Sequence, residues 1–274
     1  MPPVRGTRVA QPVVMDVRAL TARNLVWLGV RRLVRADRRV SIPKRFNLLA
    51  HAGFLWDLAT VRFGWSAVEQ RPGYRRRQYR RYVAYLQHQS RKLPRLDLSD
   101  YDREYRTVLR ERLEQLPQNW RGARVLCLAA RIGTEVKAFL DLGAFAVGVD
   151  INPGPQNRYV VHGDFHHLQY ADSSVDLVFS NSVDHVFDLD RWIVEVTRVL
   201  RDNGTLLLEV GPGMEEGGQP EFYESLCWTS VNQLVADFTD RDFVLERRSS
   251  FDRPSSGYQL LFRRTPRAGA LVRS

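Results

Sequence analysis

Apolar and polar positions along the chain alternate between strand-like and helix-like patterns from Arg124 onward. Nearly continuous apolar runs predict strands at residues 124–128, 144–150, 175–181 and 205–210. Apolar residues at helical spacing predict intervening helices at residues 134–143, 188–204 and 230–238. Because strands that are apolar on both faces need helices on both sides, this alternation predicts an α/β domain with a mostly parallel sheet.

Two further apolar runs, 242–251 and 257–265, lie about five residues apart near the C-terminus and predict an antiparallel strand pair. The predicted fold is therefore α/β: a Rossmann-like, mostly parallel sheet with a C-terminal antiparallel strand pair. We assign residues 118–265 to this domain and residues 266–274 to a C-terminal tail.

Residues 1–117 show helical patterns and predict an N-terminal helical extension. Residues 21–40 have the pattern of a short basic amphipathic helix, and residues 46–66 are apolar on nearly every face. After the break at Pro72-Gly73, Tyr79, Tyr82, Val83 and Leu86 form one helical stripe. The clearest helix covers residues 98–117, where Ser99 and Asp102 resemble a capping box and Pro117 ends the pattern.

Composition narrows the class of protein. Hydrophobic residues make up 44% of the chain and charged residues 26%, which is typical of a folded protein with a core. No run of 18 apolar residues and no signal-peptide pattern is present, so the sequence predicts a cytoplasmic protein. Cys127 and Cys227 lack the spacing of a metal or disulfide motif, so no metal site is predicted.

Charge is distributed unevenly along the chain. Residues 1–95 hold 21 Lys and Arg against 4 Asp and Glu, whereas residues 96–274 hold 20 against 27. The extension therefore suits an anionic partner, unless its arginines simply face solvent. Three interpretations remain open: peripheral contact with an anionic membrane, nucleic-acid binding, or a helical cap that folds over the active site or a partner subunit. The apolar character of residues 46–65 favours a cap or membrane contact over nucleic acid.

Ligands of such sheets bind at the carboxyl ends of the strands, so the residues that follow each strand are the candidate site. The first loop, residues 129–135, has Ala129 and Arg131 where nucleotide-binding loops carry glycine, and keeps Gly133. Asp150 ends the next strand, where a carboxylate is placed to accept hydrogen bonds from ribose hydroxyls.

The ordered segments VLCLAARIGTEV, VGVDINP, GDFHHLQYADSSVDLVFSN and RVLRDNGTLLLEV resemble the class I S-adenosylmethionine-dependent methyltransferases, specifically the small-molecule type. The resemblance covers roughly residues 120–265. It implies that S-adenosyl-L-methionine is the cofactor and that Asp164 and Phe165 hold the adenine. Asn181 and Ser182 would lie near the methionine end. The implied cofactor-binding residues are Ala129, Ala130, Arg131, Gly133, Asp150, Ile151, Asp164, Phe165, Asn181 and Ser182.

Arg131 is the main departure from that family's glycine-rich motif. Its guanidinium either reaches the cofactor's carboxylate or obstructs the loop, and we interpret the loop as a specialised one. Glu135 either tethers this loop or is an ordinary first-turn glutamate. A nicotinamide dehydrogenase would need G-x-G-x-x-G, which this loop lacks.

Candidate catalytic residues follow the strand that ends at residue 181. His185 is suited to accept a hydroxyl proton, with Asp184 orienting it or acting instead, although a loop histidine is often only a packing residue. His166 and His167 are further candidates. The 211–226 segment, with Glu215, Glu216 and Tyr223, is either a substrate lid or a mobile connection.

The sequence therefore predicts O-methylation of a small molecule or of an envelope glycan or glycolipid. An Asn-Pro-Pro-Tyr motif, typical of methylation at base amines, is absent after residue 180. The alternatives are an RNA methyltransferase that uses the basic extension and a methyltransferase-like scaffold that no longer holds cofactor. Neither the acceptor nor the oligomeric state follows from the sequence.

Overall fold

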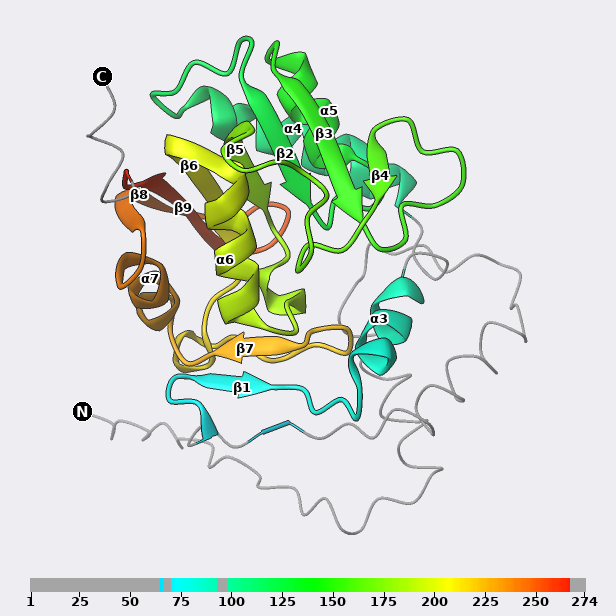
Figure 1. Ribbon diagram of the computed structural model, residues 1–274, viewed down its shortest axis with the longest axis vertical. Coiled ribbons are helices and arrows are strands. Elements are labelled where there is room, and N and C mark those ends of the chain that lie inside the picture. Colours follow the sequence, from blue (N-terminus) through cyan, green and yellow to red (C-terminus); the bar gives the residue numbers. More distant parts are fainter. Residues whose placement is uncertain (1–64, 67–69, 93–97, 267–274) are drawn as a thin grey trace, which may run out of the picture. The chain divides into compact units, whose positions relative to one another are not determined.

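The computed structural model describes residues 65–66, 70–92 and 98–266 (Figure 1). The predicted helix at 21–40 and all but the last two residues of the 46–66 segment lie outside these ranges. Contacts divide the chain into residues 1–51 and 52–274, and every described residue belongs to the second unit. The described part of the predicted extension thus forms one compact unit with the sheet.

A seven-stranded sheet forms the centre of this unit. Its strands lie in the order β4-β3-β2-β5-β6-β9-β8, with β9 antiparallel to both of its neighbours and the other pairs parallel. The strands are β2 (Arg124–Leu128), β3 (Phe145–Asp150), β4 (Val160–His162), β5 (Val175–Ser180), β6 (Leu200–Val210), β8 (Phe243–Phe251) and β9 (Gly257–Arg264). The predicted Rossmann-like sheet with a C-terminal antiparallel pair is confirmed.

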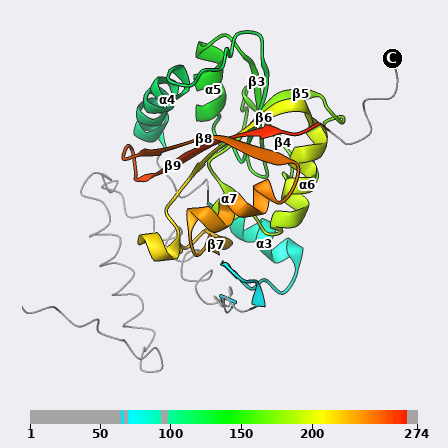
Figure 2. The same cartoon turned by 90° about the vertical axis from the view of Figure 1, so that its left-hand side faces the viewer.

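Helices cover both faces of the sheet (Figure 2). On one face α4 (Ser99–Glu114) and α5 (Thr134–Asp141) pack through Leu109, Leu113 and Phe139 onto Cys127 and Phe179. On the other face α6 (Leu189–Val199) and α7 (Val231–Thr239) pack through residues such as Trp192 and Phe238, both fully buried. Two apolar cores therefore fix the sheet and hold its strand ends in place.

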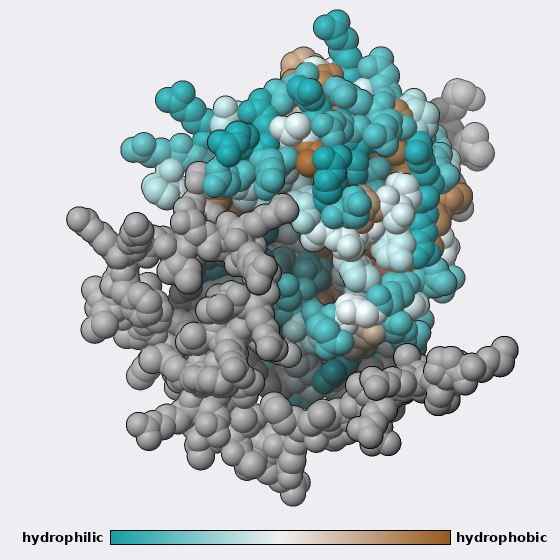
Figure 3. Space-filling view, turned by 180° about the vertical axis from the view of Figure 1, so that it is seen from behind, coloured by the Kyte–Doolittle hydropathy of each residue, from teal (hydrophilic) through white to brown (hydrophobic). Residues whose placement is uncertain are grey.

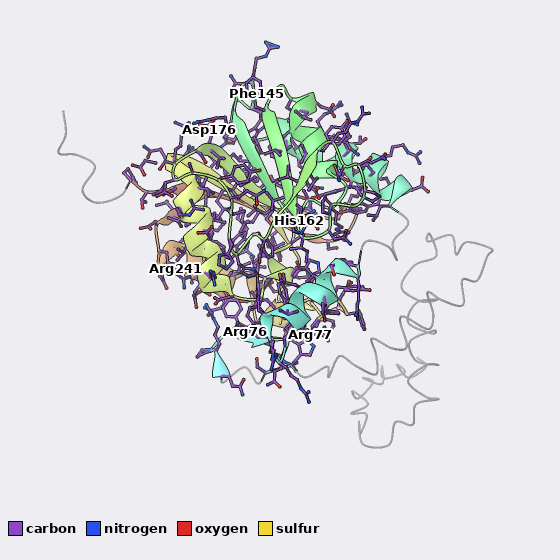
Figure 4. The ribbon with its side chains drawn as sticks, turned by 45° about the vertical axis from the view of Figure 1, so that its right-hand side comes forward. Arg76, Arg77, Phe145, His162, Asp176 and Arg241 are labelled. Atoms are coloured by element: carbon purple, nitrogen blue, oxygen red, sulfur yellow. The ribbon has the colours of Figure 1, made fainter. Side chains whose placement is uncertain are left out.

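A second, two-stranded sheet lies beyond the carboxyl ends of the parallel strands. In it β1 (Tyr74–Arg76) pairs antiparallel with β7 (Leu226–Trp228), and α3 (Tyr82–Ser90) follows β1. Figure 4 shows Arg76 and Arg77 at this end of the molecule, whereas Phe145 and Asp176 mark the amino-terminal ends of β3 and β5. The pairing brings the N-terminal segment to the edge where ligands of such sheets bind.

Several predicted element details are wrong. The helix predicted to reach Gly204 ends at Val199, because Leu200 is extended (φ −67°, ψ 136°) and already belongs to β6. No side chain caps α4 at Leu98, and the Asp102 carboxylate instead accepts hydrogen bonds from Thr134 and Lys137 on α5.

The helical stripe predicted over residues 79–86 is only partly correct, since Tyr79, Tyr82 and Leu86 pack against the core but Val83 does not. The helix α3 begins only at Tyr82, and it buries Tyr85 and His88 while Val83 is 59% exposed. The apolar pattern did not indicate the buried face of this helix, because one of its two buried side chains is His88, which is polar and hydrogen-bonds to Tyr79.

Candidate active site

A first cavity opens at the carboxyl ends of β2 and β3 and is covered by α3. Its walls come from the loop after β2, from the end of β3, from residues 163–165 and from the segment after β5. The lining residues are Tyr85, Gln89, Lys92, Ala129, Arg131, Val149, Asp150, Ile151, Asn152, Gly163, Phe165, Ser182 and His185. The cavity thus gathers many of the residues that the sequence pointed to, and α3 adds two that it did not, Tyr85 and Gln89, followed by Lys92 just after the helix.

The loop after β2 adopts the backbone of a glycine-rich loop without most of the glycines. Ala129 (φ 55°), Arg131 (φ 42°) and Gly133 (φ 80°) are all left-handed. Left-handed backbone costs a non-glycine residue about 1–2 kcal/mol, so two residues here are strained. Ala130 is buried beneath the loop and leaves no room for a side chain at Gly148, whose added Cβ would lie 2.7 Å from the Ala130 Cβ.

Asp150 is held by backbone donors on both oxygens. The Arg131 N–H donates to Oδ2 at 3.0 Å, and the Asn152 N–H donates to Oδ1 at 2.7 Å. Each carboxylate oxygen can accept a second hydrogen bond, so this carboxylate is oriented and still has acceptor sites for two hydroxyl groups. The residue is 9% exposed and lines the cavity.

Asp164 does not line the first cavity but is tied to α3. Its Oδ2 accepts the Tyr82 hydroxyl at 2.5 Å, and its Oδ1 accepts the His166 N–H at 2.9 Å. Burial opposes ionisation, but the hydrogen bonds from His166 and Tyr82 prevail and lower the pKa of Asp164 to about 2. Its neighbour Phe165 does line the cavity and is 5% exposed.

His166 is a buried structural residue. Its Nε2 accepts the backbone N–H groups of Phe187 and Asp188 at 3.2 Å each, so the neutral ring carries its proton on Nδ1. That nitrogen faces Tyr82 and Asp164. Both ring nitrogens are thus engaged, which removes His166 as a candidate base.

Asn181 and Glu135 belong to a buried polar network behind the site. The Asn181 amide donates to Glu135 Oε1 at 2.9 Å and to the Tyr105 hydroxyl at 3.0 Å, and Ser182 donates to its oxygen. Tyr105 in turn donates to Glu209. Burial raises the pKa of Glu135 to about 7.

Glu209 is the endpoint of this network and is neutralised by Arg112. The Arg112 guanidinium donates to both Glu209 oxygens, at 2.7 and 2.6 Å, from α4. Gln259 on β9 adds a hydrogen bond at 3.0 Å. Sequence reasoning missed Arg112 because a long-range ion pair leaves no local pattern.

His185 lies in the first cavity and is enclosed by polar partners. Its Nδ1–H donates to the Tyr223 carbonyl at 2.8 Å, so Nε2 is the acceptor and lies 2.7 Å from Lys92 Nζ. Burial and the nearby Lys92 hold the pKa of His185 well below its usual value. Burial, and then Arg131, lower the pKa of Lys92 to about 8.

A second cavity of about 400 Å³ adjoins the segment after β5. Its walls combine carboxyl groups and aromatic rings from α4, the 211–226 segment, β7 and the turn between β8 and β9. They include Tyr101, Tyr105, Asn181, Asp184, Glu209, Glu221, Glu224, Trp228 and Phe251. Asp184 thus lines the second cavity, whereas its neighbour His185 lines the first.

The 211–226 segment contributes to the second cavity through residues that the sequence did not single out. Glu221 and Glu224 line the cavity, whereas Glu216 accepts the N–H groups of Gly213 and Val231 and so holds the start of α7. Tyr223 contacts the site through its carbonyl, which accepts from His185 and Gln89.

Comparison with known proteins identifies the segment from β2 to β6, which contributes to the walls of both cavities. Residues 126–208, from β2 to β6, match the family model of a methyltransferase domain. The chain carries a class I S-adenosylmethionine-dependent methyltransferase domain. Among curated proteins, none matches the chain.

Solved structures of methyltransferases are similar to the chain at low sequence identity. An S-adenosylmethionine-dependent methyltransferase from Mesorhizobium loti is 16% identical, with 56% of this chain and 96% of that chain covered and a TM-score of 0.46. One from Aquifex aeolicus is 11% identical, with 62% and 94% covered and a TM-score of 0.47. A chain of the complex between the Haloferax volcanii activator Trm112 and a methyltransferase is 20% identical, with 60% and 91% covered and a TM-score of 0.48.

The first cavity of this methyltransferase fits its cofactor chemically. S-adenosylmethionine supplies a sulfonium-bound methyl group, an adenosine and an amino-acid end. The oriented Asp150 carboxylate suits ribose, Phe165 suits the adenine, and Arg131 suits the carboxylate. Gly133 and Gly148 keep the loop close to the sheet, since a Cβ at Gly133 would lie 2.6 Å from Tyr159. Within the described residues, no cluster of His, Cys, Asp or Glu is placed to hold a metal ion.

Proposed function

We propose that this methyltransferase methylates a hydroxyl group of a small molecule, such as an envelope sugar or glycolipid headgroup, bound in the second cavity. The observation that carries the proposal is the cavity of about 400 Å³ beside Asn181 and Asp184, distinct from the cofactor cavity. A space of this size suits a sugar-sized acceptor.

In this proposal Asp184 takes the proton of the acceptor hydroxyl. The hydroxyl oxygen forms a bond to the methyl carbon, the bond from that carbon to sulfur breaks, and the proton passes to the carboxylate. Asp184 lines the acceptor cavity, and burial raises its pKa, which makes its carboxylate a stronger base. His185 is the less favoured base, because its free nitrogen already faces Lys92.

Cofactor binding is tested by calorimetry with S-adenosylhomocysteine. We expect binding to the wild-type chain, and we expect Asp150→Ala to weaken it by ~1–3 kcal/mol through lost hydrogen bonds to a charged group. The exposed Asp172→Asn serves as a matched control with unchanged affinity. A folded protein with no measurable affinity for S-adenosylhomocysteine would refute the enzyme assignment.

Acceptor chemistry is tested by transfer of radiolabelled methyl groups to a panel of sugars and glycolipid headgroups, with RNA as the competing substrate. We expect product only with small acceptors and its loss in Asp184→Asn. Loss in His185→Ala with full activity in Asp184→Asn would instead make His185 the base. Methylation of RNA alone would refute the small-molecule proposal.

A further inference from the structure

The second cavity has several acidic groups in its lining. Asp184, Glu221 and Glu224 line it together with Glu209, which is already paired with Arg112. The backbone holds the group together, since the Glu221 N–H donates to Glu224 Oε2 at 2.8 Å and the Ser225 N–H donates to the Asp184 carbonyl at 2.7 Å.

The cations that act on these carboxyl groups lie outside the lining of the second cavity. Lys92 acts on all three carboxyl groups but is hydrogen-bonded to His185 in the other cavity, and Arg131 acts on Asp184. The Arg77 guanidinium donates to the backbone carbonyls of Glu221 and Glu224. Asp184 Oδ1 is shielded from solvent and has no hydrogen-bond partner among the described residues. Burial and the neighbouring Asp184 raise the pKa of Glu224, so this carboxyl holds a proton more tightly than an ordinary glutamate does.

Aromatic rings complete the same cavity. Trp228 is only 4% exposed, and its Nε1–H has no partner within the described part of the chain. Tyr101 and Tyr105 stack with ring centroids 5.2 Å apart. Aromatic faces together with desolvated carboxylates form the environment that recognises organic ammonium groups, whereas a neutral ligand leaves such carboxyls unpaired.

We infer that the acceptor carries an ammonium group, which pairs with the Glu224 carboxylate beside the hydroxyl that is methylated. This inference rests on the proposed function and names its substrate class as an amino alcohol or amino sugar. On binding, the ammonium takes the place of the Glu224 proton, which leaves to solvent. Glu221 adds negative charge, and Asp184 stays available to the hydroxyl.

The test compares two probes that differ in charge, 2-phenylethylammonium and 2-phenylethanol, by calorimetry at pH 7 with saturating S-adenosylhomocysteine. We expect the ammonium to bind about tenfold more tightly or better, as for a close interfacial charge pair. Repeating the titration in buffers of different ionisation enthalpy should reveal proton release with the ammonium only.

Glu224→Gln should remove both the preference and the proton release, while Asp172→Asn, an exposed acid outside both cavities, should keep them. S-adenosylhomocysteine binding by each variant reports its fold. Equal affinity for the two probes, no ammonium binding, or an unchanged preference in Glu224→Gln overturns the inference. Failure of the wild type to bind S-adenosylhomocysteine overturns the proposed function instead, so the two failures are distinguishable.

Discussion

At the residue scale, the loop after β2 shows that backbone conformation can persist when the residue types that favour it are replaced. Ala129 and Arg131 hold left-handed conformations that glycine adopts without strain. The Arg131 side chain lines the cofactor cavity, with its guanidinium carbon 6.0 Å from the Tyr101 ring centroid in the neighbouring cavity. Arg131 thus places a permanent positive charge between the first and second cavities.

Arg131→Gly tests two effects of this residue, the strain of its left-handed backbone and the charge of its side chain. We expect the variant to unfold at a higher temperature, because relief of the left-handed strain is worth ~1–2 kcal/mol. We also expect weaker S-adenosylhomocysteine binding, by ~1.5–3 kcal/mol for a lost charge-assisted hydrogen bond. Thermal melts and calorimetry measure both.

Ala129→Gly is the matched control, since it relieves the same kind of strain without removing charge. It should stabilise the fold and leave affinity unchanged. Tighter binding by Arg131→Gly would mean that the guanidinium obstructs the cofactor rather than holding it.

The buried Glu135 carboxyl should make the stability of the protein depend on pH. Its pKa in the fold is raised to about 7 by burial, against an ordinary value of 4.5. A carboxyl with a raised folded pKa contributes stability that is full below pH 4.5 and is lost as the pH rises through 7. Glu135→Gln should therefore gain stability relative to the wild type as the pH rises from 5 to 8, as measured by urea unfolding. A difference that does not change with pH would contradict the assignment.

At the scale of elements, one buried ion pair links α4 to the sheet in addition to their apolar packing. Arg112 and Glu209 have side chains only 11% and 3% exposed. The sequence predicted this helix from its apolar stripe, together with nearly all elements of the sheet. It could not predict the pair, and it missed β4 and the β1–β7 pairing, because three-residue strands carry too little periodicity.

The site residues likewise fall into those that the sequence predicted and those that it missed. Residues at or just after the end of a strand, such as Asp150 and Ser182, line the first cavity, because strand ends in a parallel sheet are fixed by topology. Residues supplied by remote segments, such as Lys92 and Glu224, were missed, because their approach depends on tertiary packing alone.

Arg112→Ala tests how much the ion pair with Glu209 stabilises the fold. Removing one partner leaves the Glu209 carboxylate buried and unpaired, which should lower the free energy of unfolding by ~3–5 kcal/mol. Arg110→Ala is the control on the same helix, since its exposed pair with Glu114 is worth ~0–1 kcal/mol. Equal effects of the two substitutions in chemical denaturation would rule out this role.

At the scale of the whole molecule, the N-terminal part and the rest of the chain differ in net charge. Residues 1–95 hold 21 Lys and Arg against 4 Asp and Glu. Seen from behind, the described surface is mainly hydrophilic, with only scattered hydrophobic residues (Figure 3). No helix within the described ranges is long and apolar enough to span a membrane. From the excess of positive charge in residues 1–95, we propose that the N-terminal part makes peripheral contact with an anionic membrane.

Vesicle flotation tests that role. The full chain should float with vesicles that contain anionic lipid and not with neutral ones, and 0.5 M salt should abolish flotation, since salt screens such attraction. A chain lacking residues 1–64 should stay in solution and still bind S-adenosylhomocysteine. Flotation of the shortened chain, or preferential RNA binding by residues 1–64 in gel shifts, would argue for another partner.

The pairing of β1 with β7 has a consequence for the order of events in a catalytic cycle. Gln89 of α3, which covers the cofactor cavity, donates to the Tyr223 carbonyl and the Ser225 hydroxyl beside the acceptor cavity. Displacing this cover to admit a cofactor therefore also disturbs the wall against which an acceptor rests. The expected kinetic scheme is a compulsory sequence in which the cofactor enters first, the acceptor enters second, and the demethylated cofactor leaves last.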